Sequence, residues 1–233
     1  MHTSITTLQT NGLVVPNDFP AVAYGEIHKL VVGSWSTHAL YEHYAGAWNA
    51  VAYRFRALVD YGDTFIDSLK TYGTAPEPEE RYQQEKSLFG FFSSGFSTFE
   101  SLFYGLFTIG AFVAPAAFPL LTPKDQQQVS PTRTKDAFTK AFATDPIVTA
   151  ITGTLAAPDF QKWREIRNVL THRTAPGRRM YVSIGSDDVP PDEWKLNNVP
   201  LDASIISSNR YALARLLKEL LTAAETFVIA RLP

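Results

Sequence analysis

The sequence predicts an all-α protein built as an up-and-down bundle of helices with inserted loops. Residues 30–72 contain no proline, and apolar residues recur there at helical spacing. Residues 87–122 hold a single charge, Glu100, which is typical of a helix buried on most sides. Residues 203–230 again carry apolar side chains three and four positions apart. These three segments predict the long helices of one bundle.

The composition is that of one globular domain with a sizeable core. The chain has 233 residues, of which 45% are hydrophobic and 19% charged. Its net charge of -2 argues against a surface that coats nucleic acid throughout, so a polyanion site must be a local cluster. The absence of cysteine excludes disulfides, thiolate zinc sites and a cysteine nucleophile. No Walker, dinucleotide-binding, HExxH or GxSxG motif occurs.

We expect residues 1–25 to form an N-terminal arm and residues 26–233 to form a single domain. The first twenty or so residues are polar and interrupted by two prolines. They lack the basic start and apolar run of a signal peptide, so a cytoplasmic location is expected. The segment 30–72 then predicts one continuous helix, bent near Gly62.

The second long helix raises the question of a membrane span. Residues 101–121 carry no charge and are long enough to cross a bilayer. However, three prolines crowd the far half, and serines spaced four apart form a polar line beside Glu100 (Ser93, Ser97 and Ser101). This pattern favours a central bundle helix and no membrane contact.

The remaining elements alternate between short helices and loops. Residues 115–134 are expected to be an inserted loop, followed by two short helices, "KDAFTKAFA" and "DPIVTAITGTLA". A further helix starts at Pro158 and reaches His172. "APGRR" predicts a turn and "RMYVSIG" a short strand, within or beside a second, mainly irregular insertion at residues 180–200.

The stretch "REIRNVLTHRTAPGRR", residues 164–179, gathers five arginines around one histidine and one acid. On a helix, Arg164, Asn168 and His172 form a polar stripe, with Arg167 and Thr171 beside it. The opposite side is apolar (Trp163, Ile166, Val169 and Leu170), and three more arginines follow in the exit turn (Arg173, Arg178 and Arg179). Guanidinium groups match phosphate oxygens and imidazole carries protons near neutral pH, which suits phosphodiester cleavage. Alternatively, cations at this helix end simply complement the helix dipole.

The hexapeptide "RNVLTH" resembles the Arg-polar-x3-His motif of HEPN domains, which are all-α bundles. The serine-lined segment "SSGFSTFESLFYGL" is similar to the inner helix of that family. The resemblance implies a metal-independent endoribonuclease without cofactor, often a toxin or phage-defence effector, that works as a homodimer with two facing motifs. RNA is the implied substrate, and an antitoxin protein is an implied partner. Other HEPN domains are non-catalytic RNA- or nucleotide-binding or dimerisation modules, and this alternative stays open.

The resemblance also assigns roles to particular residues. Arg167 would stabilise the phosphate, His172 would transfer a proton, and Asn168 is the polar residue of the motif. The implied chemistry is attack by the RNA 2′-hydroxyl, which leaves a cyclic phosphate. Arg173, Arg178 and Arg179 would form a local track for RNA phosphates.

Three further residues are expected to support this site: Glu100, Arg164 and Thr171. Two roles are open for Glu100, because a lone carboxylate in an apolar helix needs a partner. It either faces the cleft and orients His172 or Arg167, or it forms a buried salt bridge with Arg54 or Arg56.

Other residues of the first two helices favour structural roles. The many aromatic residues there, Phe96 and Tyr104 among them, are expected in the core, with a stacking platform for bases as the alternative. The spacing of His38 and Glu42 suits a metal ion, but a helix face without metal is the favoured interpretation.

Overall fold

The structure, a computed structural model, describes residues 2–5, 12–181, 192–196 and 198–232. In these ranges the chain forms eight helices and five short strands, and the predicted all-α class is confirmed. The helices are α1 (Ala21–Trp35), α2 (Tyr41–Tyr72), α3 (Pro78–Val113), α4 (Pro123–Gln127), α5 (Pro131–Ala141), α6 (Pro146–Ala156), α7 (Pro158–His172) and α8 (Ala203–Ile229). The strands are β1 (His2–Ile5), β2 (Leu13–Pro16), β3 (Arg178–Arg179), β4 (Glu193–Leu196) and β5 (Val199–Pro200).

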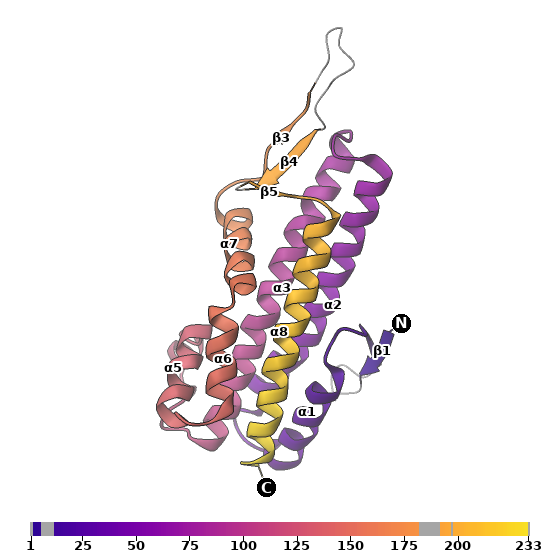
Figure 1. Cartoon of the computed structure of the whole chain (residues 1–233). Coiled ribbons are helices and arrows are strands. Elements are labelled where there is room, and N and C mark those ends of the chain that lie inside the picture. Colours follow the sequence, from indigo (N-terminus) through magenta and orange to yellow (C-terminus); the bar gives the residue numbers. More distant parts are fainter. Residues whose placement is uncertain (1, 6–11, 182–191, 197, 233) are drawn as a thin grey trace.

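Three long helices, α2, α3 and α8, lie side by side along the molecule (Figure 1). The helix α1 packs on the end of α8 near the C-terminus, and α5 and α6 cover the same end from the other side. The helix α7 lies against the upper half of α3. A small antiparallel sheet, in the order β3-β4-β5, extends beyond the upper end of the bundle.

Other segments of the chain approach the helix α3 closely at the glycines of α3. A Cβ atom on Gly95 would lie 2.2 Å from the Trp163 ring of α7. A Cβ atom on Gly110 would lie 2.5 Å from the Phe118 ring. Two aromatic rings of α2 contact α3 in the same way, Tyr61 at Gly90 and Trp48 at Gly105. The missing side chains therefore let aromatic rings from α2, α7 and the 114–122 segment reach the backbone of α3.

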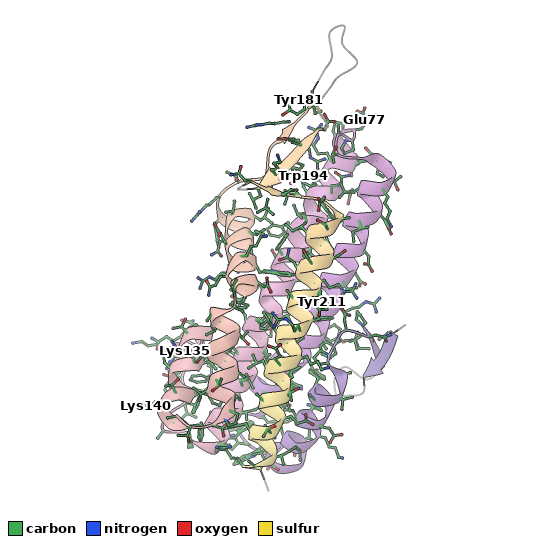
Figure 2. The ribbon with its side chains drawn as sticks, in the orientation of Figure 1. Glu77, Lys135, Lys140, Tyr181, Trp194 and Tyr211 are labelled. Carbon is green, nitrogen blue, oxygen red and sulfur yellow. The ribbon has the colours of Figure 1, made fainter. Side chains whose placement is uncertain are left out.

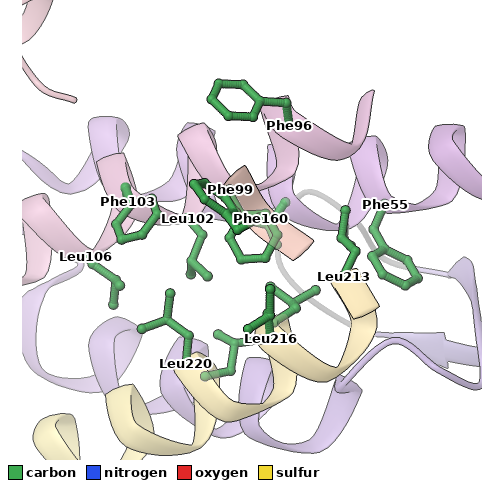
Figure 3. Packing of buried hydrophobic residues seen from close by; sticks show 14 of the residues in the cluster. Phe55, Phe96, Phe99, Leu102, Phe103, Leu106, Phe160, Leu213, Leu216 and Leu220 are labelled. Carbon is green, nitrogen blue, oxygen red and sulfur yellow. The ribbon is translucent and has the colours of Figure 1, made fainter. Parts of the chain in front are cut away.

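The helix α7 is held against α3 by two aromatic side chains. The Trp163 indole N–H donates a hydrogen bond of 2.9 Å to the Phe92 carbonyl. The Phe160 ring meets Phe99 edge to face, with ring centroids 5.1 Å apart. Figure 3 shows Phe160 among residues of α3 and α8, including Leu213 and Leu216. Buried rings of this size dominate the packing energy of a core, so they fix where the polar side of α7 lies.

The expected single helix over residues 30–72 is wrong. The chain instead forms α1 and α2, separated by a turn at residues 36–40. In this turn the His38 ring nitrogen Nδ1 accepts a 3.1 Å hydrogen bond from the Leu40 backbone N–H. The His38 ring also packs edge-on against Trp35 and Phe112. Tertiary packing therefore outweighs the helical tendency of a proline-free segment, while α2 continues without a break through Gly62.

The expected arm of residues 1–25 is shorter, because α1 begins at Ala21. The strands β1 and β2 before it pair antiparallel. This segment is also attached to the bundle, since Val15 and Phe19 are buried in the core. Asp18 forms a 2.7 Å ion pair with Arg210 of α8.

The two expected insertions contain regular structure. Residues 115–134 include α4, whose N-terminus is capped reciprocally by Thr122 and Asp125, and the start of α5. Phe118 packs in the core against Phe107 and Phe138. Residues 180–200 include β4 and β5, while most of the acidic stretch "SDDVPPDEW" and the end of "RMYVSIG" lie outside the described residues.

The expected position of the second long helix at the centre of the bundle is confirmed. By length and composition α3 would suffice to cross a membrane. Its most apolar window is nevertheless 78% buried against the rest of the chain, as in the core helix of a bundle.

Gly95→Ala tests the close approach of α7 to α3. The added Cβ would overlap Trp163 and Leu58, so we expect a loss of roughly 1–3 kcal/mol in the free energy of unfolding, measured by urea titration with circular dichroism. Gly153→Ala in α6 is the matched control, because nothing lies near its Cβ position and alanine favours helix. If both variants are at least as stable as wild type, the contact does not constrain the fold.

Candidate functional site

Two adjoining hollows follow the face of α3 between α2 and α7. The first, the α2–α3 hollow, has a volume of about 580 Å³ and is bounded on its far side by residues 129–131. The second, of about 380 Å³, lies between α3, α5, α6 and α7. Glu100 and Pro131 line both hollows, so the two adjoin, and together they are called the groove.

Arg167 lies beside this groove with its guanidinium group only partly satisfied. Its carbon Cζ is 4.9 Å from the centre of the Phe96 ring, in a cation–π contact. Nη1 donates a 3.1 Å hydrogen bond to Asn168, and Nη2 is 4.0 Å from a Glu100 oxygen. The side chain is 23% exposed, and its Nε is buried without a partner among the described residues. A guanidinium has five N–H donors, so several remain unused here.

Glu100 pairs with Arg167, which is one of the partners expected for it. Its carboxylate also accepts a 3.3 Å hydrogen bond from the Ser97 hydroxyl and is 41% exposed. The alternative salt bridges are not formed. Arg54 instead donates to the Ser97 carbonyl at 3.0 Å and to the Ser101 hydroxyl, while Arg56 pairs with Asp60.

The outer face of α7 forms a separate basic hollow of about 570 Å³. Arg164, Asn168 and Arg173 line it together with Lys162 and Glu165. Arg164 also lines the second hollow of the groove and therefore connects the two faces of α7. Among the described residues, neither Arg164 nor Arg173 takes part in an ion pair.

The side chains of His172 and Thr171 do not contact the guanidinium of Arg167. His172 is the last residue of α7 and is exposed. Its imidazole ring makes no hydrogen bond or ion pair with the residues that the structure describes. Five helical positions separate it from Arg167, which places the two side chains about 140° apart around the helix axis. The Thr171 hydroxyl donates to the Arg167 carbonyl at 2.8 Å, within the helix. One chain thus brings together Arg167, Asn168 and Glu100 but leaves the imidazole apart.

The RNA-binding role expected for Arg178 does not fit its position. Its side chain is 6% exposed and donates to the Thr74 carbonyl and to Gln84, both at 2.8 Å. Its guanidinium stacks 3.7 Å from the centre of the Trp194 ring, at the upper end of the bundle (Figure 2). It also pairs with Glu85, whose pKa is raised by burial, a shift that Arg178 opposes. Arg178 therefore fastens the sheet to α3 and to the turn between α2 and α3.

Arg179 is exposed and stands apart from the arginines of α7. It pairs across the strands with Glu193 and lines a polar hollow of about 440 Å³ with Lys195 and Asn198. The expected track is therefore divided, since Arg173 belongs to the α7 hollow and Arg179 to the sheet.

Sequence reasoning did not place His43 in a site, and it expected Tyr104 in the core, with base stacking as the alternative, whereas both residues line the α2–α3 hollow. The His43 ring nitrogen Nδ1 lies 3.1 Å from the Tyr104 hydroxyl, and its Nε2 lies 3.3 Å from the Gln126 amide nitrogen. The signal in the sequence was the spacing of residues 43, 46, 47, 50 and 54, which share one face of a helix. His38 and Glu42, which suggested a metal pair, do not share a helix, because α2 begins at Tyr41.

No protein-family model matches the chain, and no curated protein or solved structure matches it either. The described residues contain no group of three or more histidine or acidic side chains suited to a metal ion. The site is therefore characterised by its own geometry.

Arg178→Ala and Arg179→Ala separate the structural arginine from its exposed neighbour. Removing Arg178 leaves Gln84 and Glu85 without their partner, so we expect a loss of roughly 2–4 kcal/mol in the free energy of unfolding. Arg179→Ala should change it by less than about 0.5 kcal/mol. Urea titrations at pH 7 measure both, and equal effects would contradict the buried role of Arg178.

Proposed function

We propose that this chain is a metal-independent endoribonuclease of the HEPN type, with Arg167 at its centre. The observation that carries the proposal is the guanidinium of Arg167, held between Phe96 and Glu100 at the edge of a groove with donors unused. Such a group can bind a phosphate oxygen and stabilise the charge that develops during phosphodiester cleavage.

The unpaired cations of α7 support RNA as the ligand. Arg164 and Arg173 line a hollow next to Arg167, and Arg164 reaches the groove itself. On a chain with net charge -2, this clustering concentrates positive charge where phosphates would bind. In the proposed reaction the RNA 2′-hydroxyl attacks the adjacent phosphorus atom, and the bond to the 5′-oxygen breaks. The products are a 2′,3′-cyclic phosphate and a 5′-hydroxyl that takes up a proton.

We assign the proton transfer to His172 in a homodimer. In one chain this imidazole points away from Arg167, at the exposed end of α7. A second copy with its α7 facing the first would bring its His172 toward the first chain's Arg167. The cellular role that accompanies this proposal is that of a cytoplasmic toxin or defence effector, silenced by an antitoxin protein.

A second function, binding of RNA without cleavage, is favoured by two observations. His172 has no partner among the described residues that would orient its ring, and Glu100 partly neutralises Arg167. A binding module needs only the cations of α7. Its affinity for RNA would fall gradually as Arg164 and Arg173 are replaced, with a shallower salt dependence and no cleavage.

Cleavage of RNA by wild type, Arg167→Ala and His172→Ala distinguishes the two functions. The assay uses total tRNA and a long single-stranded RNA in EDTA, with the product ends tested for a 2′,3′-cyclic phosphate. We expect each variant to lose at least about 100-fold in rate, because transition-state stabilisation or proton transfer is removed. Arg215→Ala, an exposed ion-pair residue of α8, is the control and should cleave normally. Binding without cleavage by wild type would establish the second function.

Mixing the two inactive variants tests whether the site is shared between chains. A heterodimer of Arg167→Ala with His172→Ala keeps one complete site if Arg167 and His172 come from different chains. Random exchange of subunits makes about half of the dimers heterodimers, and each of these has one complete site out of two. The mixture would then recover about a quarter of the wild-type rate. If both residues act within one chain, no activity returns, and a dimeric site is excluded.

A further inference from the structure

The α2–α3 hollow contains polar and aromatic groups that cleavage at Arg167 does not use. Small residues form its floor on α2, namely Gly46, Ala47 and Ala50. Glu42 and His43 lie at one end and Arg54 at the other, so the hollow extends roughly 18 Å along α2. Its volume of about 580 Å³ is within the range of sites that bind small organic groups.

The ring of Tyr104 is held in place by a hydrogen bond with His43 of α2, whose other ring nitrogen lies beside Gln126. The Gln126 amide nitrogen also approaches the Leu120 carbonyl at 3.4 Å, which orients the amide as a donor to His43 Nε2. His43 Nδ1 then carries the proton and donates it to the Tyr104 oxygen. The hydroxyl hydrogen of Tyr104 is thereby left for a ligand, and a half-buried ring is presented in a fixed position.

The charges around the hollow favour a hydrogen-bonding ring over a bare phosphate. Glu42 is exposed and forms no ion pair with a described residue, so its carboxylate is an available acceptor. Arg54 is exposed, and one of its nitrogens is engaged by Ser97 and Ser101. A flat ligand ring with amino groups can donate a hydrogen bond to Glu42 and stack on Tyr104. A phosphate attached to that ring can pair with Arg54.

We propose that the α2–α3 hollow is a nucleobase subsite for an unpaired RNA base that carries an exocyclic amino group. The base stacks on Tyr104 and donates an amino N–H to Glu42, while its phosphate pairs with Arg54. Uracil is disfavoured because it has no amino group and its single ring N–H lies between two carbonyl oxygens. This inference rests on the proposed function, since Glu100 joins the hollow to the groove beside Arg167 and so places the bound base next to the cleaved phosphate.

Binding of short labelled oligo(A), oligo(C) and oligo(U), measured by fluorescence anisotropy, tests the subsite. The full chain carrying His172→Ala is the parent, so that the RNA stays intact. We expect the parent to bind oligo(A) and oligo(C) more tightly than oligo(U). Tyr104→Leu should weaken binding of all three about tenfold through lost stacking. Glu42→Gln should abolish the preference over oligo(U), while Glu26→Gln on α1 is the matched control without effect.

Two further measurements separate a loss of base stacking from a loss of folding. Tyr104→Phe retains the ring and should keep most of the affinity, and circular dichroism reports whether each variant is folded. If Tyr104→Leu does not fold, the exposed Glu42→Gln decides the outcome. Equal affinity for the three RNAs, unchanged by Glu42→Gln, would overturn the subsite. Cleavage by wild type would then leave the proposed function standing, whereas a wild type that neither binds nor cleaves RNA overturns both.

Discussion

The contact between Trp163 and Gly95 determines where the polar side of α7 lies. Because Gly95 has no side chain, the indole reaches the backbone of α3, and its N–H bonds to the Phe92 carbonyl. Arg167 follows Trp163 by one turn of α7, and its guanidinium lies over Phe96 and beside Glu100 of α3. The spacing of four residues on α7 puts Trp163 and Arg167 on the side of the helix that faces α3, so the apolar contact also positions the ionic one. Any change that separates α7 from α3 would move the guanidinium away from the groove.

Burial divides the arginines of residues 164–179 into three kinds. Arg178 lies inside the molecule, where its Nη1 donates to Thr74 and Gln84 and its side chain is only 6% exposed. Arg164 and Arg173 are exposed and form no ion pair with a described residue, although Arg164 donates a hydrogen bond to Gln161. Arg167 is intermediate, since it is held by Phe96 and Glu100 yet its side chain is 23% exposed. A partly desolvated guanidinium binds an oxyanion more strongly than an exposed one, which singles out Arg167 among them.

The sequence predicted much of the fold and part of the site. The helices α3, α7 and α8 follow from their apolar periodicity, and the grouping of Arg167 with Asn168 follows from their adjacent positions. The break between α1 and α2 was missed because residues 36–40 contain no proline or glycine. The His38 ring holds this turn through contacts with Trp35 and Phe112. Phe118 lies in an irregular segment, as expected, but its burial was missed because its partners, Phe107 of α3 and Phe138 of α5, are distant along the chain.

The sequence by itself determined the helical class, a local rather than global positive charge, and the absence of thiol chemistry, since composition and short-range periodicity suffice for these. Only the tertiary structure decided which side chains meet. It placed Glu100 against Arg167, separated His172 from both, buried Arg178 and brought His43 to Tyr104. These outcomes depend on how aromatic rings and glycines let α2, α3 and α7 approach one another, which is a long-range property that spacing along one helix does not contain.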